Sequence, residues 1–423
     1  MKKISILIFF IAAFTSSIYS QNINGRFSSS VYMFERYDTT DISNTYARAY
    51  QMLSLNINEG RFSLRSYLNL ENDFSKDIEG DPRLRFYNLY LEGRNLLDLF
   101  TVKLGRQPLF TNVAGGLFDG VNVDVKYSGL KLTGYYGGNV PNYQKLEIAE
   151  DFDSNYVLGG KLTSNNIDNL QLSVSYIKKN FKPQSFLSIS DETNDPISTL
   201  IQRNSYQYEF FTAEASYELK NLGNVDARFD YDVNYEQPSK YEINAQYNQI
   251  EDLSIEVYYN YREPRIKYNS IFSVFDYGNT SEIEAGGSYK INNMFTVSGR
   301  YGNVSYKDEN SGRISLGVNS DYGSIFYRKS LGYAGELDAV SLYSAYTFLE
   351  GLLTPSLGLT FTDYKLSEES EKNNLISLLA GVNYRPLREI SFDVQGQYMD
   401  NKIYKNDFRF FFKVNYWFNT NLN

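Results

Sequence analysis

Strict alternation between apolar and polar residues, sustained over long runs, constrains this chain more than any other feature. In the run NVDARFDYDVNY, residues 224–235, every odd-numbered residue is apolar or aromatic and every even-numbered residue is polar or charged. Because successive side chains of a β-strand point to opposite faces, the run predicts a strand with one oily and one polar face. The same alternation recurs at 61–71, 241–248, 253–262 and 390–398.

The length and spacing of these runs favour a transmembrane β-barrel over a soluble sandwich, whose strands also alternate. The runs reach about ten residues, the length that a tilted strand needs to cross a bilayer. Short turns on one rim and long loops on the other are typical of outer-membrane barrels. The tight connections are at 58–60, 127–129, 165–168 and 291–293, and the long polar ones are at 138–154, 182–202, 263–279 and 364–373.

The sequence therefore predicts an all-β fold, an antiparallel transmembrane β-barrel of about 22 strands with short periplasmic turns and long extracellular loops. Weak segments around 310–330 would reduce the number to about 18 or 20 strands if they merged. A barrel of this size is too wide for side chains to fill, so we expect a water-filled lumen. A soluble exported β-protein is the alternative.

The two ends of the chain fit export to the outer membrane. Residues 1–20 are predicted to be a signal peptide, because Lys2 and Lys3 precede a short apolar run that ends at Phe14. Residues 21–423 then form a single barrel domain. The late segment FRFFFKVNYWF resembles the C-terminal strand signal of bacterial outer-membrane proteins, with 419–423 expected to overhang that strand.

The composition excludes most chemistry at a catalytic or metal site. The chain has no Cys and no His, so we expect no disulfide, no Cys or His nucleophile or base, no cofactor and no His or Cys metal site. We expect no enzyme activity. The DFDSN segment at 151–155 begins like a calcium loop but lacks the glycine and the glutamate that such loops need. The net charge of −9 argues against nucleic acid as a partner.

Aromatic residues are abundant, with 39 Tyr and 29 Phe against one Trp. A tyrosine ring with a wet hydroxyl suits the boundary between lipid and water, so we expect most of these residues in the girdles that flank the apolar belt. Tyr258 lies on the polar face of its strand, which leaves open a path for sugars along aromatic rings in the lumen.

The polar faces supply the residues that we expect to line the pore: Arg61, Arg65, Lys103, Asp124, Lys126, Lys131, Asp226, Arg228, Asp230, Asp232, Glu256 and Arg262. Charged residues of opposite sign on neighbouring strands pair with one another in many sheets. We therefore expect Arg65, Arg228 and Arg262 chiefly to pair with carboxylates across strands. Contact with solutes is the second role, because rings of opposite charge set a field across a constriction.

The stretch KLGRQPLFTNVAGGLFDGV, residues 103–121, is unusual for its glycines. It matches neither a phosphate-binding loop nor a dinucleotide-binding fingerprint. LGRQ, a loop, and FDGV before an alternating strand resemble the alginate-export barrels and related outer-membrane porins over residues 102–125. That resemblance implies a substrate-selective channel, often for charged saccharides, with inward basic residues such as Lys103, Lys126 and Lys131. The many inward carboxylates argue against alginate itself.

One antiparallel register of the two strands in this stretch aligns Val102 with Val123, Leu104 with Val121 and Arg106 with Asp119. The last pair would latch the base of the hairpin as a rim salt bridge, worth under roughly 1 kcal/mol in solvent. The loop between the strands is too apolar to extend into water, so we expect it to fold into the barrel as a constriction loop. Its expected constriction residues are Leu109, Phe110, Gly115 and Gly116, with Val113 and Leu117 also needing cover and the two glycines allowing a sharp return.

These observations predict an outer-membrane porin of a Gram-negative bacterium, through which small hydrophilic solutes diffuse with selection by size and charge. The expected partners are those solutes together with outer-membrane lipid and lipopolysaccharide. A structural or adhesive barrel, whose extracellular loops bind other molecules, is the alternative function. The sequence leaves the substrate, the ion selectivity and the oligomeric state open.

Overall fold

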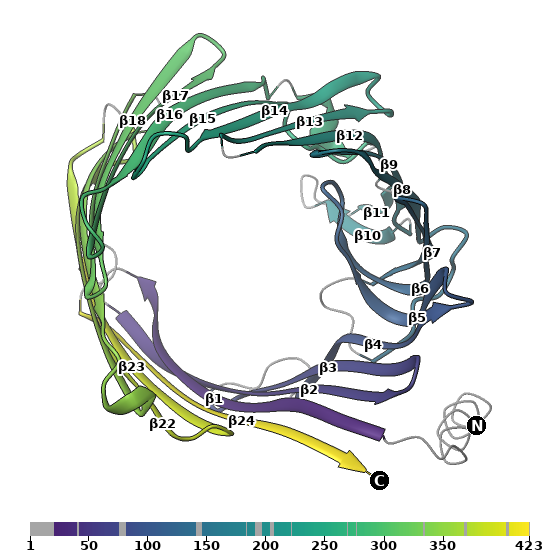
Figure 1. The fold of residues 1–423 in the computed structure, drawn as a ribbon, viewed down its shortest axis with the longest axis horizontal. Helices are drawn as coiled ribbons and strands as arrows, with labels where there is room; N and C mark the ends of the chain where they lie inside the picture. The colour runs from purple at the N-terminus through teal and green to yellow at the C-terminus, as the bar shows by residue number, and fades with distance from the viewer. Residues whose placement is uncertain are drawn as a thin grey trace.

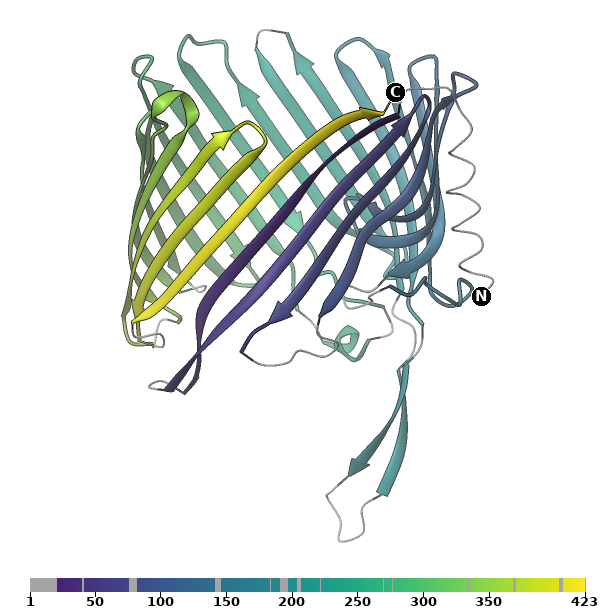
Figure 2. The same cartoon turned by 90° about the horizontal axis from the view of Figure 1, so that it is seen from below.

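A computed structural model shows the chain as one large, closed antiparallel barrel (Figures 1 and 2). It describes residues 21–39, 42–75, 82–140, 146–182, 184–190, 197–203, 207–220, 222–268, 270–275, 277–332, 335–367, 370–402 and 406–422. The predicted signal peptide at 1–20 lies outside these residues.

The first half of the barrel wall consists of ten strands and carries one hairpin outside the wall. The wall strands are β1 (Gln21–Thr39), β2 (Ile42–Glu59), β3 (Phe62–Asp73), β4 (Arg83–Leu96), β5 (Phe100–Leu109), β6 (Gly116–Tyr127), β7 (Leu130–Val140), β8 (Tyr156–Ile167), β9 (Leu170–Asn180) and β12 (Gln207–Leu219). The hairpin is β10 (Gln184–Ser190) with β11 (Ile197–Arg203).

The second half of the wall continues in chain order and contains two short 3₁₀ turns in its connections. The strands are β13 (Gly223–Asp232), β14 (Gln237–Tyr247), β15 (Leu253–Arg262), β16 (Thr280–Lys290), β17 (Phe295–Tyr306), β18 (Glu309–Ser320), β19 (Gly323–Gly332), β20 (Glu336–Ala345), β21 (Leu353–Lys365), β22 (Asn373–Leu387), β23 (Ile390–Asn401) and β24 (Asp407–Leu422). The 3₁₀ turns are η2 (Ile271–Val274) and η3 (Leu349–Gly351).

The wall is a 22-stranded sheet in which each strand pairs with its neighbours along the chain, except that β9 pairs with β12 across the β10–β11 hairpin. Pairing of β1 with β24 closes the ring, which removes the exposed edges that an open sheet would have. The predicted all-β antiparallel barrel of about 22 strands is confirmed. The weak segments around 310–330 do not merge, since β18 and β19 are separate strands.

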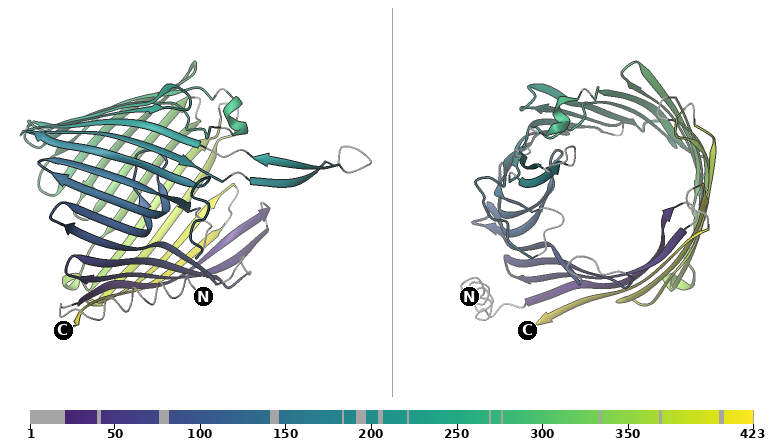
Figure 3. Two further views of the ribbon diagram at one scale, coloured as in Figure 1. Left: turned by 90° about the vertical axis from the view of Figure 1, so that its right-hand side faces the viewer. Right: turned by 180° about the vertical axis from the view of Figure 1, so that it is seen from behind.

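The predicted tight connections all lie on the rim where β1 begins and β24 ends, which we call the short-turn rim. The predicted long connections all lie on the opposite, long-loop rim, as expected. That rim also carries tight turns, such as residues 307–308 between β17 and β18. The β10–β11 hairpin extends beyond the long-loop rim (Figures 2 and 3).

The expected overhang after the last aromatic residue is wrong. β24 stays paired with β1 through Asn419↔Asn24 to Leu422↔Gln21, so its pairing with β1 runs from Phe410 to the last described residue. The polar residues at the end of β24 match equally polar residues at the start of β1: the Asn22 amide donates to the side-chain oxygens of both Asn419 and Asn421, at 2.7 Å each.

Register fixes which side chains face inward. The β5–β6 hairpin curves into the ring (Figure 1), and its tip at Asn112 contacts the side chains of Glu214 on β12 and Arg228 on β13. Even-numbered residues of these two strands therefore face the lumen. Cross-strand pairing carries the same assignment around the ring and places the polar residues inside.

The outer face is apolar and exposed, as a lipid-facing surface requires. Leu104, Leu316 and Leu359 are 46–51% exposed there. Outward aromatic side chains gather near the short-turn rim, where we expected a girdle: Phe62, Tyr127, Tyr217, Tyr247, Tyr289 and Phe295. Within the described part of the chain, no helix has the length and apolar character to cross a membrane.

Candidate functional site

The β5–β6 hairpin leaves the wall at a row of three glycines. Register places Gly105, Gly120 and Gly137 side by side on β5, β6 and β7, with their missing side chains on the inner face. A Cβ atom at any of them would lie 2.2–2.4 Å from a backbone oxygen of an adjacent strand. The absence of side chains there lets the sheet curl sharply inward, as glycine does at barrel corners.

Residues 110–115, which we call the inner loop, join the two strands inside the barrel. Of the two glycines expected at the tight return, Gly116 has a positive φ and Gly115 does not. Ala114, which was not expected there, adopts the left-handed conformation with φ of 53°. Gly116 has φ of 148°, outside the range that residues with a side chain favour. A Cβ on Gly115 would lie 2.9 Å from the Leu109 carbonyl oxygen, so its small size matters more than its flexibility.

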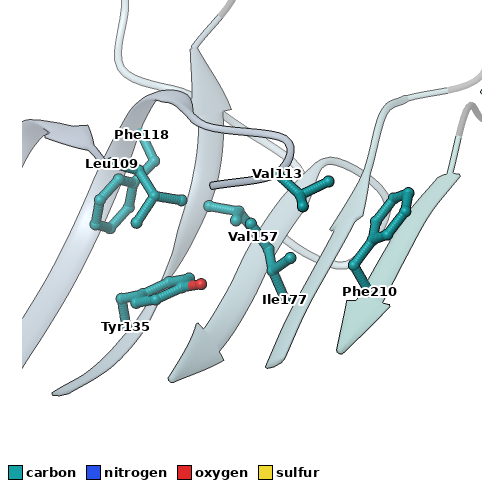
Figure 4. Packing of buried hydrophobic residues seen from close by; sticks show 7 residues of the cluster. All are labelled: Leu109, Val113, Phe118, Tyr135, Val157, Ile177 and Phe210. Atoms are coloured by element: carbon teal, nitrogen blue, oxygen red, sulfur yellow. The ribbon is translucent and has the colours of Figure 1, made fainter. Parts of the chain in front are cut away.

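An apolar cluster packs the hairpin against the inner wall (Figure 4). Leu109 and Phe118 on the hairpin and Val113 on the inner loop are at most 6% exposed. Their partners come from four successive wall strands: Tyr135, Val157, Ile177 and Phe210. Each buried large side chain contributes roughly 1.5–3 kcal/mol, so this cluster holds the loop inside. The expectation that Phe110 is covered is wrong, because its ring is 91% exposed.

Polar contacts fix the tip of the inner loop to the wall strands β9, β12 and β13 and to the connection after β15. The Asn112 side-chain amide donates to the Glu214 carboxylate, and the Asn112 backbone carbonyl oxygen accepts from Arg228 at 3.2 Å and from Arg265 at 3.4 Å. The Lys179 ammonium donates to the carbonyl oxygens of residues 114 and 115 at 3.2 and 3.1 Å. The loop is therefore held by cations that bind its backbone oxygens.

The predicted register of β5 and β6 is confirmed, with Val102 opposite Val123, Leu104 opposite Val121 and Arg106 opposite Asp119. The last two side chains form a two-point ion pair, with Nε–Oδ1 of 2.8 Å and Nη2–Oδ2 of 2.9 Å. They alternate with inward residues, so the pair lies on the outer face of the hairpin.

The expectation that this pair is a solvent-exposed rim bridge is wrong. The side chains of Arg106 and Asp119 are only 6% and 7% exposed, because residues 146–149 of the β7–β8 connection lie over them. The Ala149 backbone N–H donates to the Asp119 carboxylate at 2.8 Å, and Arg106 donates to the carbonyl oxygen of Glu147. The latch is thus a buried pair with a cover from a neighbouring loop.

Register also places the predicted pore-lining residues. All but Arg61 lie on the inner face of their strands, on β3, β5, β6, β7, β13 and β15. Arg61 belongs to the turn between β2 and β3 and binds Asp98 of the next turn along this rim at 2.9 Å. It therefore lies at the mouth of the lumen and not on its wall.

The three inward arginines expected to pair with carboxylates across strands have different partners. Arg65 pairs with Glu92 across β3 and β4 at 3.7 Å. Arg228 pairs at 2.6 Å with Asp230 of its own strand, with the cross-strand Glu242 farther away at 3.9 Å. Arg262 donates to the Thr280 hydroxyl at 3.0 Å.

Tyr258 also faces inward, and its hydroxyl donates to the Glu242 carboxylate at 3.2 Å. That hydrogen bond orients the ring against the wall, so Tyr258 is built into a polar network of the lumen.

Sequence reasoning missed the wall residues that hold the inner loop. Glu214 and Lys179 lie on strands whose alternation was recognisable, so their inward direction could have been predicted. Nothing else in the sequence marked them as contacts of the inner loop. Arg265 lies in a connection, where no period marks the direction of a side chain. The curl at the glycine row determines which wall strands the inner loop contacts. No local sequence pattern shows how far the hairpin extends into the lumen.

Comparisons with known proteins gave structural likeness only. No protein-family model and no curated protein sequence matches the chain, so the resemblance to alginate-export barrels has no family match behind it. The chain is similar to the translocation pore of the P pilus usher PapC, with a TM-score of 0.48 and 9% identity over 94% of this chain and 99% of that one.

Two outer-membrane barrels are similar at a slightly lower level. OccAB1 of Acinetobacter baumannii has a TM-score of 0.43 and 9% identity, over 94% of this chain and 96% of its own. OccK2 of Pseudomonas aeruginosa, solved in complex with glucuronate, has a TM-score of 0.43 and 10% identity, over 94% and 98%. At such identities the likeness concerns the barrel architecture alone.

Proposed function

We propose that this protein is a channel of the bacterial outer membrane through which small hydrophilic solutes, saccharides among them, pass by diffusion. One observation carries the proposal: a closed 22-stranded barrel with a polar inner face holds an uncharged loop inside its lumen. A barrel of this width encloses water, and an inserted loop narrows that water to a selective opening.

Selection in this proposal acts by size and by charge. The inner loop limits size, because the apolar cluster and the polar anchors keep it inside. Charge selection comes from the inward side chains predicted from the sequence, such as Lys103, Asp124 and Glu256. Opposite charges on the inner wall orient a polar solute while it passes.

The outer face supports placement in a bilayer whose outer leaflet carries charged headgroups such as those of lipopolysaccharide. Near the long-loop rim, outward ion pairs replace the apolar residues: Lys329 with Asp338 at 3.2 Å and Lys372 with Asp363 at 3.0 Å. Lys372 lies in the connection after β21, where Asp363 raises the pKa of its ammonium group. Charges at this level suit headgroups and not acyl chains.

Liposome swelling tests the proposal. Vesicles that contain the protein should swell in neutral sugars, with a rate that falls steeply as the sugar grows from a mono- to a trisaccharide. A variant with residues 110–115 replaced by Asn-Gly, a two-residue turn that suits the pairing of Leu109 with Gly116, should admit larger sugars. Vesicles that hold folded barrel and never swell would contradict the proposal.

A structural or adhesive barrel is the second candidate, and the β10–β11 hairpin is the observation that favours it. The hairpin extends beyond the long-loop rim, and in the described part of the chain its two strands pair only with each other (Figure 3). Removal of residues 184–203 should abolish binding to a surface partner and leave sugar permeation intact if the barrel has both roles.

A further inference from the structure

Lys179 is the most unusual charged group near the inner loop. The residue is only 8% exposed, yet no carboxylate of the described residues lies within ion-pair distance of its ammonium group. Its partners are two carbonyl oxygens of the inner loop and the ring of Phe181, whose centroid is 5.3 Å away. Buried charges normally have a charged partner, because desolvation is costly.

Other cations gather at the same place. Lys267 lies 5.4 Å from the centroid of the same Phe181 ring. Arg228 and Arg265 share the fully buried Asp230, at 2.6 and 3.5 Å, and both donate to the Asn112 carbonyl oxygen.

The carboxylates around these cations are already engaged. Glu214 binds Lys161, Glu242 binds Lys240 at 2.5 Å, and Asp232 accepts from backbone N–H groups of its own turn at 3.0 and 3.2 Å. The same elements also carry Glu209 on β12, which binds Lys178 at 2.9 Å, and Glu263 after β15, which accepts from the Tyr261 hydroxyl. None of these carboxylates pairs with Lys179.

We propose that Lys179, Arg228 and Arg265 form an anion-binding site that the carbonyl oxygens of the inner loop occupy in this closed form, and that a solute bearing a carboxylate or phosphate displaces them and releases the loop. The proposal rests on the channel function above and adds a substrate class and a gate to it.

The chemistry favours this exchange. The cations already donate charge-assisted hydrogen bonds to neutral carbonyl oxygens. A carboxylate or phosphate adds the attraction between opposite charges and can accept two parallel N–H bonds from an arginine. The Arg265 side chain is 42% exposed, so a solute that enters from the long-loop rim reaches it first. Displacement of the Asn112 carbonyl then leaves the loop tip held at Lys179, which the same anion approaches next. A neutral sugar offers no such replacement.

A spin label on the loop tests the proposal directly. The chain has no Cys, and Phe110 is exposed, so a Phe110→Cys variant accepts a single nitroxide at the loop. In lipid vesicles, galacturonate should raise the mobility of the label, while galactose at the same concentration and ionic strength should not. Arg265→Gln and Lys179→Gln should each raise the galacturonate concentration for half the change about tenfold, since each removes one charge-assisted contact.

Two further variants keep the test decisive. Lys290→Gln removes an inward ammonium from β16, outside the proposed site, and should leave the response intact. An Asn112→Cys/Glu214→Cys pair should form a disulfide that locks the loop and abolishes anion-dependent changes in conductance until it is reduced.

The outcomes separate the two proposals. Equal mobility with galacturonate and galactose, in protein that admits neutral sugars, overturns the anion gate and leaves the channel standing. A Lys290→Gln variant that loses the response as fully as Lys179→Gln also overturns the specific site, because general electrostatics would explain both. Protein that admits no sugar in either loop state overturns the channel and the gate together.

Discussion

Arg106 and Asp119 show how one residue pair can depend on a loop far along the chain. The two side chains meet across β5 and β6 on the outer face of the hairpin. The 146–149 segment covers the pair and adds a hydrogen bond from Ala149 to Asp119. A pair buried in this way is worth little by itself, but removal of one partner leaves a charge without compensation.

Arg106→Leu is therefore expected to lower the free energy of unfolding by about 3–5 kcal/mol. Arg106→Leu/Asp119→Leu should recover most of that loss, since no charge then stays buried. Urea unfolding in lipid vesicles measures both, with the single Trp, Trp417 on β24, as the fluorescent probe of the barrel seam. A single variant as stable as the parent would show that the pair is solvated.

Sequence reasoning predicted the partners in this pair and not its environment. Alternating faces and complementary charges define which residues of two neighbouring strands oppose one another. Burial of the pair depends on residues 146–149. They belong to the β7–β8 connection, where no alternation of apolar and polar residues indicates how the chain is placed. The same limit explains Arg61, where the alternation continues into a turn and its direction ceases to hold.

The β5–β6 hairpin is the element on which the proposed constriction depends. Its apolar loop predicted an inward fold, and the structure places that loop inside the ring. The curl itself arises from Gly105, Gly120 and Gly137, which are far apart in sequence and adjacent only after β5, β6 and β7 pair. Recognition of that row requires the register, so the sequence alone did not identify it.

Gly120→Val is expected to straighten the hairpin, because its Cβ would lie 2.2 Å from the Tyr136 carbonyl oxygen. The inner loop would then lose its contacts with Ile177 and Phe210, and large sugars should enter vesicles faster. Gly134→Val is the matched control, since a Cβ there meets no atom within 4 Å. Unchanged sugar permeation in Gly120→Val would show that the glycine row does not set the loop position.

At the scale of the whole molecule, a single period defines the architecture. Alternation of apolar and polar residues predicted the barrel, its approximate strand number and the polarity of its two faces, since each consecutive strand repeats the same pattern. The pattern also places adjacent residues of one strand on opposite faces of the barrel. On β21, Leu359 faces outward and Thr360 faces the lumen.

Leu359→Arg is expected to cost about 2–4 kcal/mol if that face lies near the middle of a bilayer. Thr360→Arg, one residue away, should cost far less because its side chain enters the water-filled lumen. Folding yield and urea stability in vesicles compare the two variants, with the heat-modifiable gel mobility of each as the check that the barrel forms. Equal penalties would contradict the lipid-facing assignment.

Single-channel conductance in a planar bilayer tests the central claim most directly, namely that the inner loop narrows an open, water-filled lumen. The parent protein should insert as a conducting channel, and the variant with residues 110–115 replaced by Asn-Gly should insert with a clearly larger unit conductance. A barrel that inserts without conducting, or a loop variant with the conductance of the parent, would contradict the account.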